Sequence, residues 1–78
     1  MAVRAYLLIQ TEVGQAASVA DAVRGLEGVK SADNVTSSYD VIAVAEAADV
    51  DELGKMVVSK VHLVEGITRT VTCLVVNL

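Results

Sequence analysis

The chain has 78 residues and a formal net charge of −4, because ten acidic residues outnumber six basic ones. The bases are scattered, and nucleic-acid binding needs clustered lysines and arginines to neutralise phosphates, so we expect no direct binding of nucleic acid. No apolar run approaches the roughly 20 residues that span a bilayer. The single cysteine permits no internal disulfide and suits a reducing compartment. We therefore expect one cytoplasmic domain without a membrane anchor.

Apolar side chains make up 54% of the residues, which is more than one small core can hide. A chain of this length buries only about 60–65% of the surface that its unfolded form exposes. The surplus has to be covered by another subunit, so the composition predicts an oligomer.

In the first half, residues 3–11 alternate in polarity and carry β-branched and aromatic side chains, which predicts a strand. Residues 15–26 place apolar side chains at helical spacing. Residues 29–36 follow as a more polar strand, because they include several poor strand formers.

In the second half, residues 39–45 form an apolar segment that predicts a buried strand. A second helix begins at Asp49, and Glu52 three residues later completes a D-x-x-E capping pattern. Gly66 ends this segment, and residues 67–77 are predicted to form a long last strand.

The two halves share a short repeat. Leu26-Glu27-Gly28-Val29 and Val64-Glu65-Gly66-Ile67 each join the end of a helix to the start of a strand. The element order β-α-β-β-α-β is typical of the ferredoxin-like α+β sandwich. We expect an antiparallel sheet with both helices on one face.

The face without helices is predicted to be a dimer interface. Tyr6 and Leu8 on the first strand, and Leu74 and Val76 on the last, are the bulky residues that we expect there. Two sheets packed face to face would bury them in a dimeric α+β barrel.

Catalytic chemistry has little support. His62 is the only histidine, near the end of the second helix, and no partner is evident that would orient it as a general base. Cys73 lies within a strand and is interpreted as a small buried apolar residue. Metal-binding, phosphate-binding and nucleophile motifs are missing, so we expect no enzyme, no metal and no cofactor.

One loop concentrates polar groups beside a buried strand. A hairpin turn explains such a loop, because Ser and Asp bond nearby backbone amides. A row of threonines on one face of the last strand is explained by cross-strand Thr–Thr pairs. A second hypothesis is that both bind a small zwitterion, with a carboxylate for its ammonium and hydroxyls for its carboxylate. The residues are Thr36, Ser37, Ser38, Tyr39 and Asp40 in the loop, with Asp40 as the carboxylate, and Thr68, Thr70 and Thr72 in the strand.

The pattern T-x-x-Y-D before an apolar strand, together with V-E-G-I-T-R-T-x-T after the second helix, resembles the effector domain of the Lrp/AsnC (feast/famine) regulators. This domain is also called the RAM module, and the resemblance covers essentially the whole chain. It implies a ferredoxin-like domain that dimerises through its sheet and assembles into rings such as octamers or decamers. It also implies an amino acid bound between subunits, near the loop residues from Thr36 to Asp40 and near Thr68 and Thr70.

Two departures from that family are visible. Ser37 occupies a position where the family usually has glycine, which would hinder a close approach of the backbone to a ligand. Full-length members begin with a helix-turn-helix domain, and 78 residues leave no room for one. We therefore expect residues 1–78 to be a stand-alone effector domain that binds no DNA. It would modulate transcription indirectly, alone or in assemblies with full-length Lrp/AsnC regulators.

Two other functions stay open. A small cofactor-free enzyme of the monooxygenase type shares the dimeric α+β barrel, and the fold does not decide between them. The single histidine and the lack of Phe and Trp argue against it. A purely structural oligomerisation module shares every feature except ligand binding. The sequence does not identify the amino acid, the size of the ring or the regulator partner.

Overall fold

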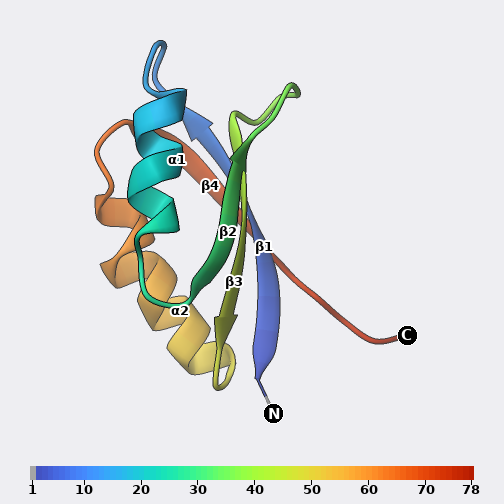
Figure 1. Ribbon diagram of the computed structural model, residues 1–78. Helices are drawn as coiled ribbons and strands as arrows, with labels where there is room; N and C mark the ends of the chain where they lie inside the picture. The colour runs from blue at the N-terminus through green and yellow to red at the C-terminus, as the bar shows by residue number, and fades with distance from the viewer. Residues whose placement is uncertain (1) are drawn as a thin grey trace.

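The computed structural model describes residues 2–78 and has one sheet with two helices packed against it (Figure 1). The predicted element order is confirmed. In chain order the elements are β1 (Val3–Thr11), α1 (Ala16–Arg24), β2 (Val29–Asn34), β3 (Val41–Ala47), α2 (Val50–Ser59), the short 3₁₀ helix η1 (Val61–Leu63) and β4 (Ile67–Leu74).

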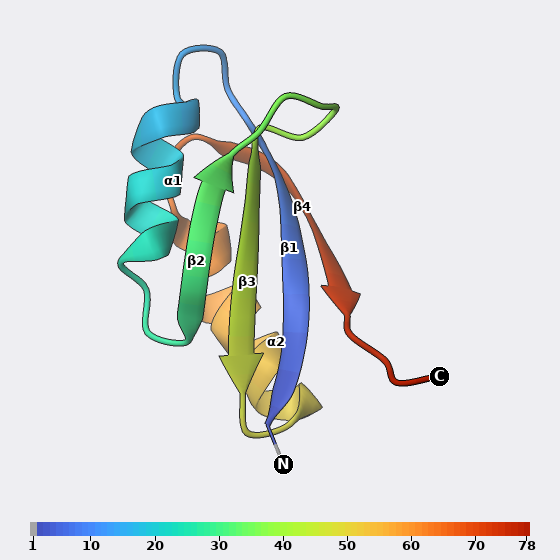
Figure 2. The ribbon, with the colours of Figure 1, turned by 45° about the vertical axis from the view of Figure 1, so that its right-hand side comes forward.

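The sheet has the strand order β2-β3-β1-β4, and every neighbouring pair is antiparallel. Both helices cover the same face, as Figures 1 and 2 show from two directions. The two strands of each half run in the same direction but are not neighbours, because a strand of the other half lies between them. This arrangement confirms the predicted ferredoxin-like sandwich.

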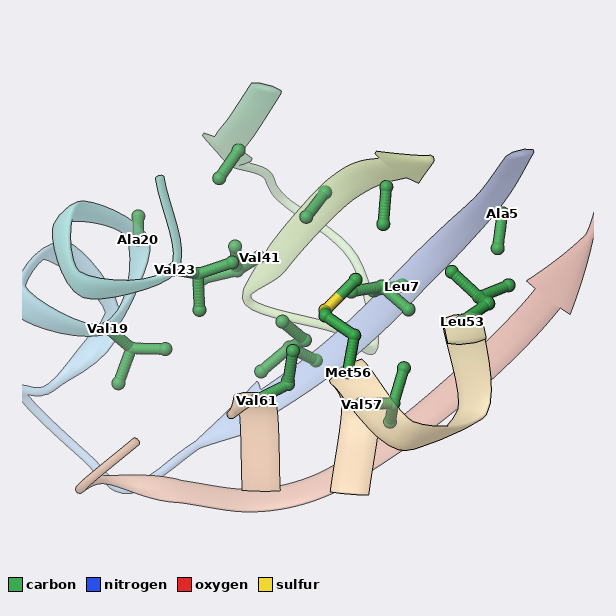
Figure 3. Packing of buried hydrophobic residues seen from close by; sticks show 14 residues of the cluster. Ala5, Leu7, Val19, Ala20, Val23, Val41, Leu53, Met56, Val57 and Val61 are labelled. Atoms are coloured by element: carbon green, nitrogen blue, oxygen red, sulfur yellow. The ribbon is translucent and has the colours of Figure 1, made fainter. Parts of the chain in front are cut away.

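The core lies between the sheet and the helices (Figure 3). Ala5, Leu7 and Ile9 of β1 point toward the helices and are 0% exposed. Alternate residues of β3 do the same, and the helices contribute their apolar faces. Small and β-branched side chains fill this layer, which is why two helices of 9 and 10 residues can pack closely on the sheet. The core residues contributed by the helices are Val19, Ala20, Val23, Leu53, Met56, Val57 and Val61.

The short repeat seen in the sequence forms two equivalent joints. Gly28 and Gly66 both have positive φ, at 93° and 99°, a conformation that glycine adopts without steric cost. The carbonyl of each glycine accepts a backbone hydrogen bond, from a residue of β3 in one case and from the residue directly after β1 in the other. Glu46 donates its backbone N–H to Gly28 at 2.8 Å, and Glu12 donates to Gly66 at 2.8 Å.

Several element boundaries differ from those predicted. The Asp49 side chain caps α2 as expected, since its Oδ1 accepts from the Glu52 N–H at 2.8 Å. The helix stops at Ser59, however, so His62 lies in the 3₁₀ turn rather than in the helix. Tyr39 belongs to the turn before β3, because the strand begins only at Val41.

The register of β4 corrects the predicted dimer face. Leu74 is paired with Ala5, so it points to the helix side and not to the open face. It lies beside α2 at the edge of the sheet, 45% exposed. The residues of β4 on the helix-free face are Arg69, Val71 and Cys73, opposite Gln10, Leu8 and Tyr6. Val76 follows the end of β4 and is exposed.

Candidate functional site

The loop between β2 and β3 is fastened to the end of β1 by Asp40. The Asp40 backbone N–H donates to the Ile9 carbonyl at 2.8 Å. One oxygen of its carboxylate, Oδ2, accepts from the Thr11 N–H, also at 2.8 Å. The pairing of β1 with β4 is irregular between Gln10 and Thr11, and the carboxylate receives the amide at that irregularity. Asp40 therefore has a structural task beside any role in binding.

The rest of the loop is held by local bonds. Ser37 Oγ accepts from the Tyr39 N–H at 3.0 Å and donates to the Tyr39 carbonyl at 3.1 Å. Gln10 donates from its side-chain Nε2 to the Ser38 carbonyl at 2.9 Å. These bonds form the kind of turn that Ser favours. They leave the side chains of Thr36 and Ser38 exposed.

Thr70 and Thr72 of β4 lie on the helix side of the strand. Thr70 lies opposite Ile9 and Thr72 opposite Leu7, so neither takes part in a Thr–Thr pair with β1. Thr70 Oγ1 is shielded from solvent and has no hydrogen-bond partner, the only such side-chain atom found in residues 2–78. A shielded hydroxyl without a partner is unfavourable, and a bound group could reach this atom only if its surroundings moved.

A pocket of about 340 Å³ lies beside the start of β4, lined by His62, Ile67, Thr68, Arg69 and Thr70. We call it the edge pocket. Consecutive strand residues point to opposite faces, so a pocket lined by four of them in succession runs along the outer edge of the strand. The end of α2 at Ser59 places His62 of η1 at this pocket.

The loop and the edge pocket lie at the same end of the sheet, where β1 and β2 end and β3 and β4 begin (Figure 2). β1 separates them within one chain, because β3 and β4 flank it on opposite sides. No loop residue lines the edge pocket. The structure thus brings the two predicted groups to one end of the domain without uniting them in a single pocket.

Three residues near this end were missed by the sequence analysis: Gln10, Thr11 and Arg69. Gln10 and Thr11 hold the loop, and Arg69 lies opposite Gln10 across the strand pair. Only the strand register reveals these partners, since they are about 30 to 60 positions apart in the chain. The alternation of β1 indicates that Gln10 is on the face away from Ile9, but not what it meets there.

The remaining candidates do not form a catalytic group. Cys73 is exposed in the single chain rather than buried, and it lies on the helix-free face opposite Tyr6. Among residues 2–78 no set of three or more His, Cys, Asp and Glu side chains is placed to hold a metal ion. The helices in this part of the chain are too short or too polar to cross a membrane.

Residues 4–77 match the model of the Lrp/AsnC ligand binding domain. The chain belongs to this family. It is also 32% identical, over 54 residues, to an uncharacterized HTH-type transcriptional regulator of Pyrococcus furiosus. That match covers 69% of the present chain but only 36% of the archaeal protein, so the chain corresponds to about a third of that regulator.

Solved structures share the fold over nearly the whole length. A protein from Thermus thermophilus superposes with a TM-score of 0.90 at 29% identity, covering 97% of this chain and 95% of that one. A hypothetical protein from Pyrococcus horikoshii gives 0.88 at 25% identity, covering 96% and 90%. AsnC of E. coli gives 0.89 at 20% identity and covers 96% of this chain but 51% of its own, so this likeness shows the fold alone.

Proposed function

We propose that this chain is an effector module that binds a free amino acid between subunits and assembles through its sheet. The observation that carries the proposal is the match of residues 4–77 to the Lrp/AsnC ligand binding domain. A structural neighbour with a TM-score of 0.84, a transcriptional regulator of Neisseria meningitidis, was crystallised in complex with L-Met. At 18% identity the likeness to this neighbour shows the fold alone. We use its ligand, L-methionine, as a test ligand for the present chain.

The position of the polar groups supports a site shared between subunits. In one chain the loop residues Thr36–Asp40 and the pair Thr68 and Thr70 lie at the same end of the sheet but on either side of β1. A second subunit approaching this end would supply the missing half. Asp40 keeps acceptor capacity for an ammonium group, since a carboxylate has about four lone-pair sites and one is used by the Thr11 N–H.

The dimer is proposed to form through the helix-free face. Its centre is apolar, and its ends carry polar pairs, Arg4 with Glu46 at one end and Gln10 with Arg69 at the other. Such a stripe is what a second sheet would cover. The apolar residues of this face are Tyr6, Leu8, Ile42, Val44 and Val71. Rings such as octamers or decamers would then be built from these dimers.

In the cell the module would act in the cytoplasm, where it would change the response of full-length Lrp/AsnC regulators by joining their assemblies. It would have no catalytic activity and would not contact DNA itself, because its bases are few and scattered. Fluorescence anisotropy with a duplex at low salt tests the last point, and saturable micromolar binding there would contradict it.

Isothermal calorimetry against the common amino acids tests the effector role. We expect at least one to bind at millimolar concentration or below. If none does, the effector role fails and the structural oligomerisation module takes its place.

Asp40 variants separate ligand binding from loop structure. Asp40→Asn keeps an oxygen that can accept from the Thr11 N–H but removes the charge, whereas Asp40→Ala removes both. Both should lose about 1.5–3 kcal/mol of binding free energy if the carboxylate holds the ammonium. Only the alanine variant should also lose unfolding free energy. Equal affinity of Asp40→Asn and the unmodified protein would exclude the ammonium contact.

A further inference from the structure

The polar side chains of the edge pocket differ from those of the loop in being uncommitted. Across residues 2–78, none of the side chains of His62, Thr68, Arg69 and Thr70 makes a hydrogen bond or ion pair. The chain's other arginines are engaged: Arg4 pairs with Glu46 at 3.0 Å and Arg24 with Asp21 at 2.7 Å. Arg69 is the arginine that is left without an anion among the described residues.

These four side chains are rich in donors. A guanidinium offers five N–H groups and no acceptor, each hydroxyl offers one O–H, and an imidazole offers at least one N–H. No Asp or Glu lines the pocket. The free edge of β4 adds backbone groups, because within residues 2–78 β4 pairs only with β1. A ligand that satisfies this set has to bring acceptors and negative charge.

We propose that Arg69 binds a carboxylate of the effector, with the exposed Thr68 hydroxyl as a second donor and His62 closing the pocket. This assignment rests on the proposed function and specifies which end of the amino acid the edge pocket takes. A planar guanidinium matches the two oxygens of a carboxylate, and such charge-assisted pairs are stronger than neutral hydrogen bonds.

The position of Arg69 connects this carboxylate to the loop. Arg69 lies opposite Gln10, and the Gln10 amide holds the Ser38 carbonyl of the loop. An amino acid carboxylate at Arg69 would therefore lie next to the strand position that fixes the loop. Different elements would bind the two ends of the ligand: β4 would bind the carboxylate, and the loop of a neighbouring subunit would bind the ammonium group.

Calorimetry with L-methionine, L-methioninamide and L-glutamate tests the assignment on the unmodified protein and on Arg69→Gln. The amide lacks the α-carboxylate, and glutamate adds a second carboxylate. Lys30→Gln is the matched control, since it makes the same charge change on the exposed side of β2, at the opposite edge of the sheet. Circular dichroism establishes that each variant is folded.

If Arg69 binds the α-carboxylate, Arg69→Gln lowers the affinity for methionine by at least tenfold, whereas Lys30→Gln does not. The unmodified protein binds the amide at least tenfold more weakly than methionine, and Arg69→Gln does not lower the affinity for the amide further. If the bound group is a side-chain carboxylate, only glutamate loses affinity in Arg69→Gln. Either pattern supports the carboxylate site and names its source.

Two results would overturn the assignment while leaving the effector role intact: unchanged affinities in Arg69→Gln, or equal losses for methionine and its amide. Failure of all common amino acids to bind the unmodified protein would instead remove the effector role. In that case succinate, which has carboxylates and no ammonium, tests carboxylate binding at the edge pocket separately from the effector role. If succinate raises the melting temperature of the unmodified protein more than that of Arg69→Gln, the carboxylate site is supported. Equal rises in the two proteins would exclude it.

Discussion

The two faces of the sheet carry different side chains on the same strands. On β1, Leu7 points to the helices and is 0% exposed, whereas its neighbour Tyr6 points to the other face and is 45% exposed. On β3, Val41, Ala43 and Ala45 are buried while the alternate residues remain half-exposed. Both sets are largely apolar, yet only one has a partner within the chain.

This difference indicates how the 78 residues divide their work. The helix-covered face supplies the core that folds the domain, and the helix-free face offers apolar area that the proposed dimer would cover. Substitutions on the two faces should therefore have effects of different kinds. Those on the covered face should act at every protein concentration, and those on the open face should act through association.

The largest effect is expected for Leu7→Ala. Removing a fully buried leucine side chain usually costs about 2–5 kcal/mol, a large part of the stability of so small a domain. Urea unfolding followed by circular dichroism at several protein concentrations measures it. Leu8→Ala is the matched control on the opposite face. Its loss should be largest where the protein is dimeric and should shrink as dilution dissociates the dimer. An equal loss in the dissociated monomer would contradict the division between the faces.

Val71→Asp should separate the subunits while leaving the fold in place. Val71 lies opposite Leu8 on the helix-free face, so the new carboxylate would be buried at the interface without a partner. Light scattering should show a shift from the assembly toward the monomer, with the helical circular dichroism signal retained. A folded monomer for the unmodified protein at micromolar concentration would refute the dimer.

Cys73 gives an independent measure of the same interface. It is the single cysteine of the chain and lies opposite Tyr6 on the helix-free face. Its thiol should react slowly with a disulfide reagent in the unmodified protein and quickly in Val71→Asp. A fast reaction in both would show that this face is open to solvent.

How much of this could be predicted from the sequence differs between the fold and the site. The alternation of residues 3–11 and the helical spacing of the first helix predict these elements closely, because burial on one face imposes a period on each. The sequence also predicts the last strand, but it assigns Leu74 to the wrong face. Both faces of that strand carry apolar residues, so the pattern could not show which set meets the helices.

The site was harder to predict because its contacts are not local. The charge of Asp40 makes it a candidate, whereas its carboxylate meets the Thr11 amide from a strand 29 positions away. The same holds for Arg69, whose position opposite Gln10 depends on the register of two strands. Hydrogen-bond partners across a sheet follow from the tertiary arrangement, and residue type alone does not reveal them.

A smaller effect on the covered face is expected for Asp49→Ala. The Asp49 side chain caps α2, which lies over the core, and loss of such a cap costs about 1 kcal/mol. The unfolding free energy should fall equally at all protein concentrations, and the dimer dissociation constant should not change. Asp51→Ala, in the first turn but not at the cap position, is the control. An equal loss in both variants would mean that charge near the helix start, rather than the cap, is what matters.

The smallest effect on stability is expected for Ser37→Gly, which belongs to neither face. Ser37 is exposed, and its hydroxyl bonds only to the Tyr39 backbone, so the unfolding free energy should change by about 0.5 kcal/mol or less. Its effect on ligand binding should be larger, because glycine permits a closer approach of the loop backbone to a bound amino acid. Calorimetry should show tighter binding of the same amino acid, and Ser38→Gly provides the comparison one position away. Weaker binding in Ser37→Gly would mean that the serine-stabilised turn is itself the form of the loop that receives the ligand.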